Sequence, residues 1–223
     1  MKLVWKYILH FWYVASNWNI WMAFFMIYDN IRGSWKYGTN TFIAVELEDL
    51  TITHGDRKKA SRYEAVSFYM LEKLFSAFQK ISALRSVIDL GSGKGRVLMV
   101  APHFGFTDIT GIDFAKELCE QAIANMKEKE KYFPEIKWRV INGNVEDYDI
   151  GSQDSVFFMF NPFTEIVLER FLEKLDHSCH EFPRRIYFLY ASPQHQQLLL
   201  DTGYAIVYHK QMMHLESVIA VRD

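Results

Sequence analysis

The pattern of apolar and polar residues divides most of the chain into short apolar runs and longer segments with helical spacing. The short runs have the length of buried strands, and the longer segments place apolar residues every three or four positions. The predicted strands cover residues 87–90, 109–113, 136–141, 155–160, 185–191, 204–210 and 215–222. The predicted helices cover residues 65–81, 97–101, 115–131, 165–178 and 194–201. This alternation is typical of an α/β domain, and the last two runs suit an antiparallel hairpin.

The first part of the chain has a different pattern. Residues 7–28 contain no Lys, Arg, Asp or Glu and are long enough for a membrane span. Polar residues such as His10, Asn17 and Asn19 interrupt the segment, so we expect helices that pack on the α/β domain or on a second subunit as a homo-oligomer. Two alternatives stay open, a helix lying on a membrane surface and a membrane-spanning helix.

A turn-rich region separates this segment from the α/β domain. Residues 28–32 and 38–41 are rich in turn-forming residues, and residues 45–50 suit a short helical turn. We therefore expect an aromatic helical extension and linker over residues 1–60, followed by the α/β domain over residues 61–223.

Composition narrows the class of partner. The chain has 223 residues, 50% of them hydrophobic, and a net charge of −2, which argues against nucleic acid as a partner. Its two cysteines, Cys119 and Cys179, lack a C-x-x-C spacing, so we expect reduced thiols in the cytoplasm. His177 and His180 flank Cys179 without further ligand residues, so no metal site is expected.

The first predicted strand ends in an acidic residue and a glycine-rich loop, residues 91–95. Asp89 is followed by Gly91, Gly93 and Gly95, with Ser92 between the first two glycines. Glycines let a ligand approach the backbone closely, and the helix that follows offers free N–H groups at its start. The loop is therefore a predicted ligand-binding site.

Two familiar nucleotide-binding motifs do not fit this loop. A phosphate-binding P-loop requires Ser or Thr after its lysine, but Lys94 is followed by Gly95. The dinucleotide motif requires a glycine at the position of Arg96. The remaining pattern, D-x-G-x-G-x-G, resembles the cofactor loop of class I S-adenosylmethionine-dependent methyltransferases.

Further candidate residues lie at the ends of the next strands. Asp113 ends the second strand, one βα unit after the glycine-rich loop, where its carboxylate could accept hydrogen bonds from both hydroxyls of a ribose. Phe114 follows it directly. By the same resemblance, Asn144 or Glu146 and the backbone of Val145, after the third strand, would meet the adenine ring.

The resemblance extends from residue 28 to residue 208 and points to a group of uncharacterised bacterial class I methyltransferases. It implies a Rossmann-like sheet of seven strands, mostly parallel with an antiparallel last hairpin, behind an N-terminal helical extension. It also implies S-adenosyl-L-methionine as the cofactor. The cofactor-binding residues that we expect are Asp89, Gly91, Ser92, Gly93, Gly95, Asp113, Phe114, Asn144, Val145 and Asn161.

The candidate catalytic residues are Asn161, Pro162 and Phe163, which follow the fourth predicted strand. This triplet resembles the Asn-Pro-Pro-Tyr/Phe motif of amine and amide N-methyltransferases, without its second proline. Asn161 could accept a hydrogen bond from an acceptor N–H, and Phe163 could stack on a planar acceptor. The structural alternative is that Asn161 caps the next helix and Phe163 belongs to the core.

Four other residues are weaker candidates. Lys94 and Arg96 could meet the cofactor carboxylate or be exposed cations, and Tyr63 could close the cofactor site or pack in the core. His195 is the best candidate for a general base.

The functional hypothesis is methyl transfer to an unidentified acceptor, with nitrogen as the expected atom, in a small molecule or a protein side chain. The alternative is a non-catalytic cofactor-binding or scaffold protein whose N-terminal helix serves oligomerisation or membrane attachment.

Overall fold

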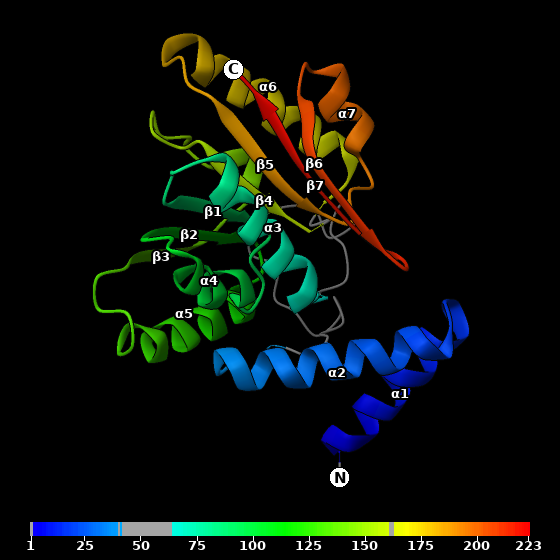
Figure 1. The fold of residues 1–223 in the computed structure, drawn as a ribbon. Coiled ribbons are helices and arrows are strands. Elements are labelled where there is room, and N and C mark those ends of the chain that lie inside the picture. The colour runs from blue at the N-terminus through cyan, green and yellow to red at the C-terminus, as the bar shows by residue number, and fades with distance from the viewer. Residues whose placement is uncertain (1, 40, 42–63, 161–162) are drawn as a thin grey trace.

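The computed structural model describes residues 2–39, 41, 64–160 and 163–223, and Figure 1 shows their fold. The described residues form a seven-stranded sheet in the order β3-β2-β1-β4-β5-β7-β6. The strands are β1 (Ser86–Leu90), β2 (Asp108–Asp113), β3 (Lys137–Asn142), β4 (Val156–Met159), β5 (Ile186–Ala191), β6 (Ala205–Met212) and β7 (Leu215–Arg222). The first five strands run parallel, and β7 pairs antiparallel with both β5 and β6.

Helices lie at the N-terminus and on both faces of the sheet (Figure 1). The α-helices are α1 (Lys2–Asn17), α2 (Ile20–Tyr37), α3 (Phe68–Ile81), α4 (Arg96–Val100), α5 (Lys116–Glu130), α6 (Glu165–Glu181) and α7 (Gln196–Asp201). Two short 3-10 helices are η3 (Ala101–Phe104) and η4 (Val145–Asp147). The predicted sheet, mostly parallel with an antiparallel last hairpin, is confirmed.

Alternate residues of the central strands build two separate cores. In β4, Val156 and Phe158 face the core that includes α3 and α4, while Phe157 and Met159 face the core that includes α6. This follows from the two-residue period of a strand, which turns successive side chains to opposite faces. Because both faces are covered, the central strands consist almost entirely of apolar residues.

The strand order reverses between β1 and β4, which are adjacent in the sheet but separated in sequence by β2 and β3. In open parallel sheets, ligands bind beyond the carboxyl ends of the strands at such a reversal. Gly91, after β1, and Phe160, after β4, therefore lie at the edge where a ligand is expected.

The N-terminal segment forms two helices because the chain turns at Asn19. The backbone of Asn19 is extended, and its side-chain Oδ1 accepts a hydrogen bond from the backbone N of Met22 at 2.8 Å. This is an N-cap, which starts α2 in a new direction. No helix among the described residues is long and apolar enough to cross a membrane.

The prediction of a turn over residues 28–32 is wrong, because α2 continues through them to Tyr37. Their polar side chains, Asp29 and Asn30, are buried in contacts with other elements instead of forming a turn. The predicted boundary at residue 60, the helical turn over residues 45–50, and Tyr63 lie outside the described residues.

Candidate cofactor and acceptor site

The glycine-rich loop folds tightly against the end of β2. The backbone N–H groups of Gly91 and Ser92 both donate to the carbonyl oxygen of Ile112 at 2.9 Å. Gly91 and Gly93 have φ angles of 83° and 51°, a left-handed conformation that favours glycine. This shape brings the loop backbone to the carboxyl end of β2, beside Asp113.

Asp113 is held by the loop itself. Its Oδ2 accepts the backbone N–H of Gly93 at 2.8 Å, and its Oδ1 accepts that of Ala115 at 2.9 Å. Burial raises the pKa of Asp113 to about 6, although these two hydrogen bonds act in the opposite direction. Each carboxylate oxygen has a second lone pair, so the side chain can still accept hydroxyl groups.

Two buried polar atoms beside the loop lack a partner among the described residues. They are Oδ2 of Asp89 and Oγ of Ser92. Burial raises the pKa of Asp89 well above its ordinary value, and the nearby charge of Asp113 raises it further. Buried polar atoms without partners are rare in folded proteins, so these two atoms fit a site whose ligand supplies the missing hydrogen bonds. The hydroxyl and amino groups of an adenosyl cofactor meet that requirement.

The end of β3 lies against Asp113. Gly143 donates its backbone N–H to the carbonyl oxygen of Asp113 at 3.0 Å. The side chain of Asn144 is bonded to Glu146, with Nδ2 2.7 Å from Oε2, and the side chain of Val145 is buried. The expected adenine contacts of Asn144 and Val145 stay a prediction.

Arg96 has a structural role that the sequence did not reveal. It begins α4 directly after the glycine-rich loop, and it is buried, so the reading as an exposed cation is wrong. Its Nη2 donates to Oδ1 of Asn30 at 2.9 Å, and its guanidinium lies over the ring of Phe68 at 4.1 Å. Further bonds reach Thr41 Oγ1 at 2.7 Å and the carbonyl of Val66 at 2.6 Å. Arg96 thus joins the loop to α2 and to the start of α3. Lys94 is buried too.

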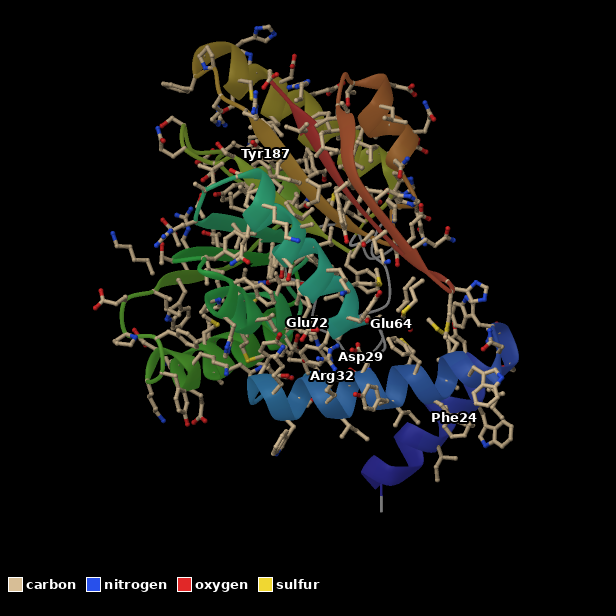
Figure 2. The ribbon with its side chains drawn as sticks, in the orientation of Figure 1. Phe24, Asp29, Arg32, Glu64, Glu72 and Tyr187 are labelled. Carbon is tan, nitrogen blue, oxygen red and sulfur yellow. The ribbon has the colours of Figure 1, made fainter. Side chains whose placement is uncertain are left out.

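A second group of charges joins α2 to α3, as Figure 2 shows for Asp29, Arg32 and Glu72. Asp29 accepts Ser67 Oγ at 2.8 Å and the backbone N–H of Tyr69, at the start of α3. Glu72 accepts both terminal nitrogens of Arg32 at 3.0 Å. Burial opposes ionisation of Glu72, yet hydrogen bonds led by that from Arg32 lower its pKa. The N-terminal extension is therefore tied to the α/β domain by paired charges.

A cavity of about 130 Å³ lies between the α1–α2 hairpin and the carboxyl edge of the sheet. We call it the acceptor cavity. From the sheet edge it is lined by Phe160 and Ser192, which directly follow β4 and β5. The other lining side chains include Val14, Trp18, Met22, Met26, Met70 and Leu215. The acceptor cavity is therefore mostly apolar, and it lies one strand away from the glycine-rich loop.

Two ionisable residues of this cavity were not identified from the sequence. Glu64, just before α3, and His214, in the turn between β6 and β7, both line it and are exposed. Figure 2 shows Glu64 near the start of α3. Neither residue lies in a recognisable motif, because the fold alone brings the two segments together.

The predicted acceptor motif is described only in part. Asn161 and Pro162 lie outside the described residues. Phe163 is half-buried and packs against the core that includes α6, and the N-cap position of α6 is Thr164. Phe114 is half-buried beside Asp113, and His195 precedes α7, where it does not line the acceptor cavity.

The part of the chain that the structure describes contains no candidate metal site. There, no three His, Cys, Asp or Glu side chains gather in a suitable group. His177 and His180 are exposed on α6, near Glu181 and Asp176.

Comparisons with known proteins agree with this geometry. Residues 87–181 match a family model described as a methyltransferase domain. None of the curated proteins compared with the chain by sequence matches it.

Solved structures of low sequence identity share the fold. A SAM-dependent methyltransferase from Aquifex aeolicus is 15% identical, with a TM-score of 0.52 over 68% of this chain and 90% of that one. Magnesium protoporphyrin IX methyltransferase from Synechocystis, with bound SAM, is 12% identical, with a TM-score of 0.52 over 70% and 79%. An RNA methyltransferase from Salinibacter ruber, in complex with S-adenosyl-L-homocysteine, is 16% identical, with a TM-score of 0.50 over 70% and 91%.

The matched domain begins in β1 and contains the glycine-rich loop, Asp113 and Asn144, and the sheet is mostly parallel with an antiparallel last hairpin, as predicted. The predicted family and its cofactor, S-adenosylmethionine, are thereby confirmed. The chain thus carries a methyltransferase domain over residues 87–181 and shares the fold of solved S-adenosylmethionine-dependent methyltransferases.

Proposed function

We propose that this chain methylates a nitrogen atom of a small apolar molecule that binds in the acceptor cavity. The observation that carries the proposal is the position of this cavity at the carboxyl edge of the sheet. Phe160 lines the cavity and follows β4, the direct neighbour of β1 and its glycine-rich loop. Asn30 also lines the cavity and is bonded to Arg96, at the end of that loop.

The residues around the loop suit the cofactor. Asp113 would accept the ribose hydroxyls, and the unpartnered atoms of Asp89 and Ser92 would be satisfied by polar groups of the same ligand. When bound, S-adenosylmethionine supplies a methyl carbon that a nitrogen lone pair attacks in line, while the breaking C–S bond leaves its electrons on sulfur.

The chain's own part in the reaction is to position the acceptor, exclude water and remove one proton. Met22, Met26 and Met70 give the cavity adaptable apolar walls. A neutral amine becomes cationic when it gains a methyl group, and it must then lose a proton. Glu64 and His214 line the cavity and are exposed, so either could pass that proton to water.

The nitrogen preference comes from Asn161-Pro162-Phe163, which directly follows Phe160 in the sequence. If Asn161 orients an acceptor N–H, Asn161→Ala should lower kcat and leave cofactor affinity nearly unchanged. Unchanged turnover in this variant would remove Asn161 from the mechanism and leave the nitrogen assignment without support.

The acceptor can be sought directly. Purified protein and methyl-labelled S-adenosylmethionine are incubated with cell extract, and mass spectrometry identifies the compounds that gain the label. We expect a small apolar amine, and Met26→Trp, which would fill the cavity, should reduce its labelling without changing cofactor affinity. Ile166→Trp, on the exposed side of α6, is the matched control. Label on protein or RNA, or normal labelling by Met26→Trp, would contradict the proposal.

A further inference from the structure

Helix α2 has two apolar faces that point in opposite directions. Met22, Gly33 and Tyr37 are buried on its inner face, against the α/β domain. The outer face has a second stripe at intervals of three and four residues, the spacing that aligns side chains along a helix. Its members are Trp21, Phe24, Tyr28, Ile31 and Trp35. These five side chains are between 55 and 92% exposed.

The stripe continues onto α1 through aromatic contacts. The ring of Phe11 lies edge-on to Phe24 at 5.1 Å and to Trp12 at 5.6 Å, and Trp12 is itself 62% exposed. In Figure 2, Phe24 lies toward α1, whereas Asp29 and Arg32 lie toward α3. We call Trp12 together with the five residues of the stripe the aromatic face. Contiguous exposed apolar surface of this kind marks an interaction site.

Charge distinguishes this part of the chain from the rest. Residues 1–39 contain four basic residues and one acidic residue, a net charge of +3, while the whole chain carries −2. The remaining residues therefore carry −5. The single acidic residue, Asp29, is buried and bonded to Arg32 and Ser67, and Glu72 of α3 pairs with both Arg32 and Lys36. The hairpin therefore combines exposed aromatic rings with two further basic residues near its start, Lys2 and Lys6, and its only carboxylate is buried.

We propose that the aromatic face docks the protein on the surface of an anionic lipid bilayer, with the α1–α2 hairpin lying in the plane of the interface. Trp and Tyr have an apolar ring and a polar atom, which suits the boundary between lipid headgroups and hydrocarbon. The positive charge complements anionic headgroups. Neither α1 nor α2 is long and apolar enough to cross the bilayer, so the hairpin lies on it.

A second copy of the chain suits the aromatic face less well. Self-association would bring two positive hairpins together without an exposed acidic residue in either to pair with the other's cations. Helical seams between two chains also favour Leu, Ile and Val, whereas Ile31 is the only aliphatic member of this face.

Docking would also place the acceptor cavity one helix away from the lipid surface. Met22 and Met26 line the cavity from the inner face of α2, so the lipid and the cavity would lie on opposite sides of one helix. This consequence rests on the proposed function, since it concerns an apolar acceptor. Docking itself does not, and it is therefore tested without cofactor or acceptor.

The experiment is flotation of the full-length protein with vesicles. Vesicles of phosphatidylcholine alone are compared with vesicles that also contain phosphatidylglycerol. The test variant carries Trp21→Gln, Tyr28→Gln and Trp35→Gln, and the control carries Tyr132→Gln and Ile166→Gln, which replace exposed apolar residues elsewhere. We expect the wild type and the control to float with the anionic vesicles, and the test variant to bind them at least about tenfold more weakly.

Two further measurements keep the result interpretable. Thermal melting of the test variant shows whether it is folded, and brominated lipids should quench the tryptophan fluorescence of the wild type if its rings reach the bilayer. Equal flotation of wild type and test variant, or no flotation with anionic vesicles, would overturn the proposal. A wild-type dimer that the three substitutions dissociate, without any flotation, would overturn it in favour of a second copy.

Discussion

Two groups of charged side chains among the described residues differ in their partners. At the junction of α2 with the α/β domain, Asp29, Arg32 and Arg96 are each bonded to several groups. Beside the glycine-rich loop, Asp89 and Asp113 are buried without a basic partner among the described residues. One region has matched charges, and the other has acidic groups whose pKa burial raises.

This difference indicates that the junction has a structural role, whereas the region of the glycine-rich loop is a binding site. Buried charges with complete sets of partners hold two elements together, and the loss of one partner leaves another group unsatisfied. Buried acids without partners destabilise the free protein, and such perturbed groups cluster at functional sites. The comparison therefore predicts opposite effects of substitutions: loss of stability at the junction, and loss of cofactor affinity at the loop.

Arg96→Met should have the largest effect on stability. The change leaves Asn30, Thr41 and the carbonyl of Val66 without their buried donor, so we expect unfolding to become easier by at least about 3 kcal/mol. Urea denaturation measures the change, with Arg85→Met, an exposed arginine, as the control. A change below about 1 kcal/mol would show that Arg96 does not hold the junction.

Gly93→Val should abolish most cofactor binding while the protein still folds. The left-handed backbone at Gly93 opposes valine, and a valine side chain would stand where the cofactor is expected, so we expect affinity to fall by about a hundredfold. Gly105→Val is the matched control, since Gly105 has a φ of 76° far from the loop. Both variants should lose stability, but only Gly93→Val should lose affinity in calorimetry. An equal affinity in the two would refute this role.

Much of the loop region could be predicted from the sequence because its signals are local. Asp89 and the glycines lie within seven consecutive residues, and Asp113 lies at the end of the next strand. The strands themselves are short apolar runs, so their number and direction follow from pattern and resemblance. The positions of Asp89 and Asp113 in the fold match the prediction, although their contacts with the cofactor stay untested.

The junction could not be predicted because its partners are distant in sequence. Arg96 and Asn30 are 66 positions apart, and nothing near either residue indicates the other. Asp29 and Asn30 resemble turn residues locally, yet tertiary contacts keep them inside α2. The turn at Asn19 is a different case, since an asparagine before an apolar helical segment is an N-cap signal that could have been recognised.

Asp113→Ala should weaken cofactor binding by about 1.5–3 kcal/mol, the contribution of a hydrogen bond to a charged group. The ribose hydroxyls would lose their acceptor, while the loop would lose the bond from Gly93 at 2.8 Å. Calorimetry measures the affinity, and Asp108→Ala, at the exposed beginning of the same strand, is the control. Unchanged affinity in Asp113→Ala would contradict the assignment of the ribose site.

Asp89→Asn should change the stability by an amount that depends on pH. Burial raises the pKa of Asp89, so its carboxyl group binds a proton more tightly in the folded wild type than in the unfolded chain. That contribution to stability is complete below the ordinary pKa of about 3.9 and is lost as the pH rises through the raised value. The side chain in the Asp89→Asn variant does not ionise, so the variant does not lose this stability as the pH rises. Its stability relative to the wild type should therefore increase from pH 4 to pH 8, by about 1.4 kcal/mol for each tenfold change in the ionisation constant.

Thermal melting of the free protein across this pH range measures the effect, with Asp108→Asn as the exposed control. If Asp89 is an open acceptor for the cofactor, Asp89→Asn should bind S-adenosylmethionine more weakly than the wild type does. The difference between its melting temperature and that of the wild type should be larger at pH 8 than at pH 4. A parallel pH dependence of the two proteins would mean that Asp89 ionises in the fold as easily as in the unfolded chain. The contrast between the two regions would then rest on Asp113 alone, whose carboxylate already accepts two backbone N–H groups.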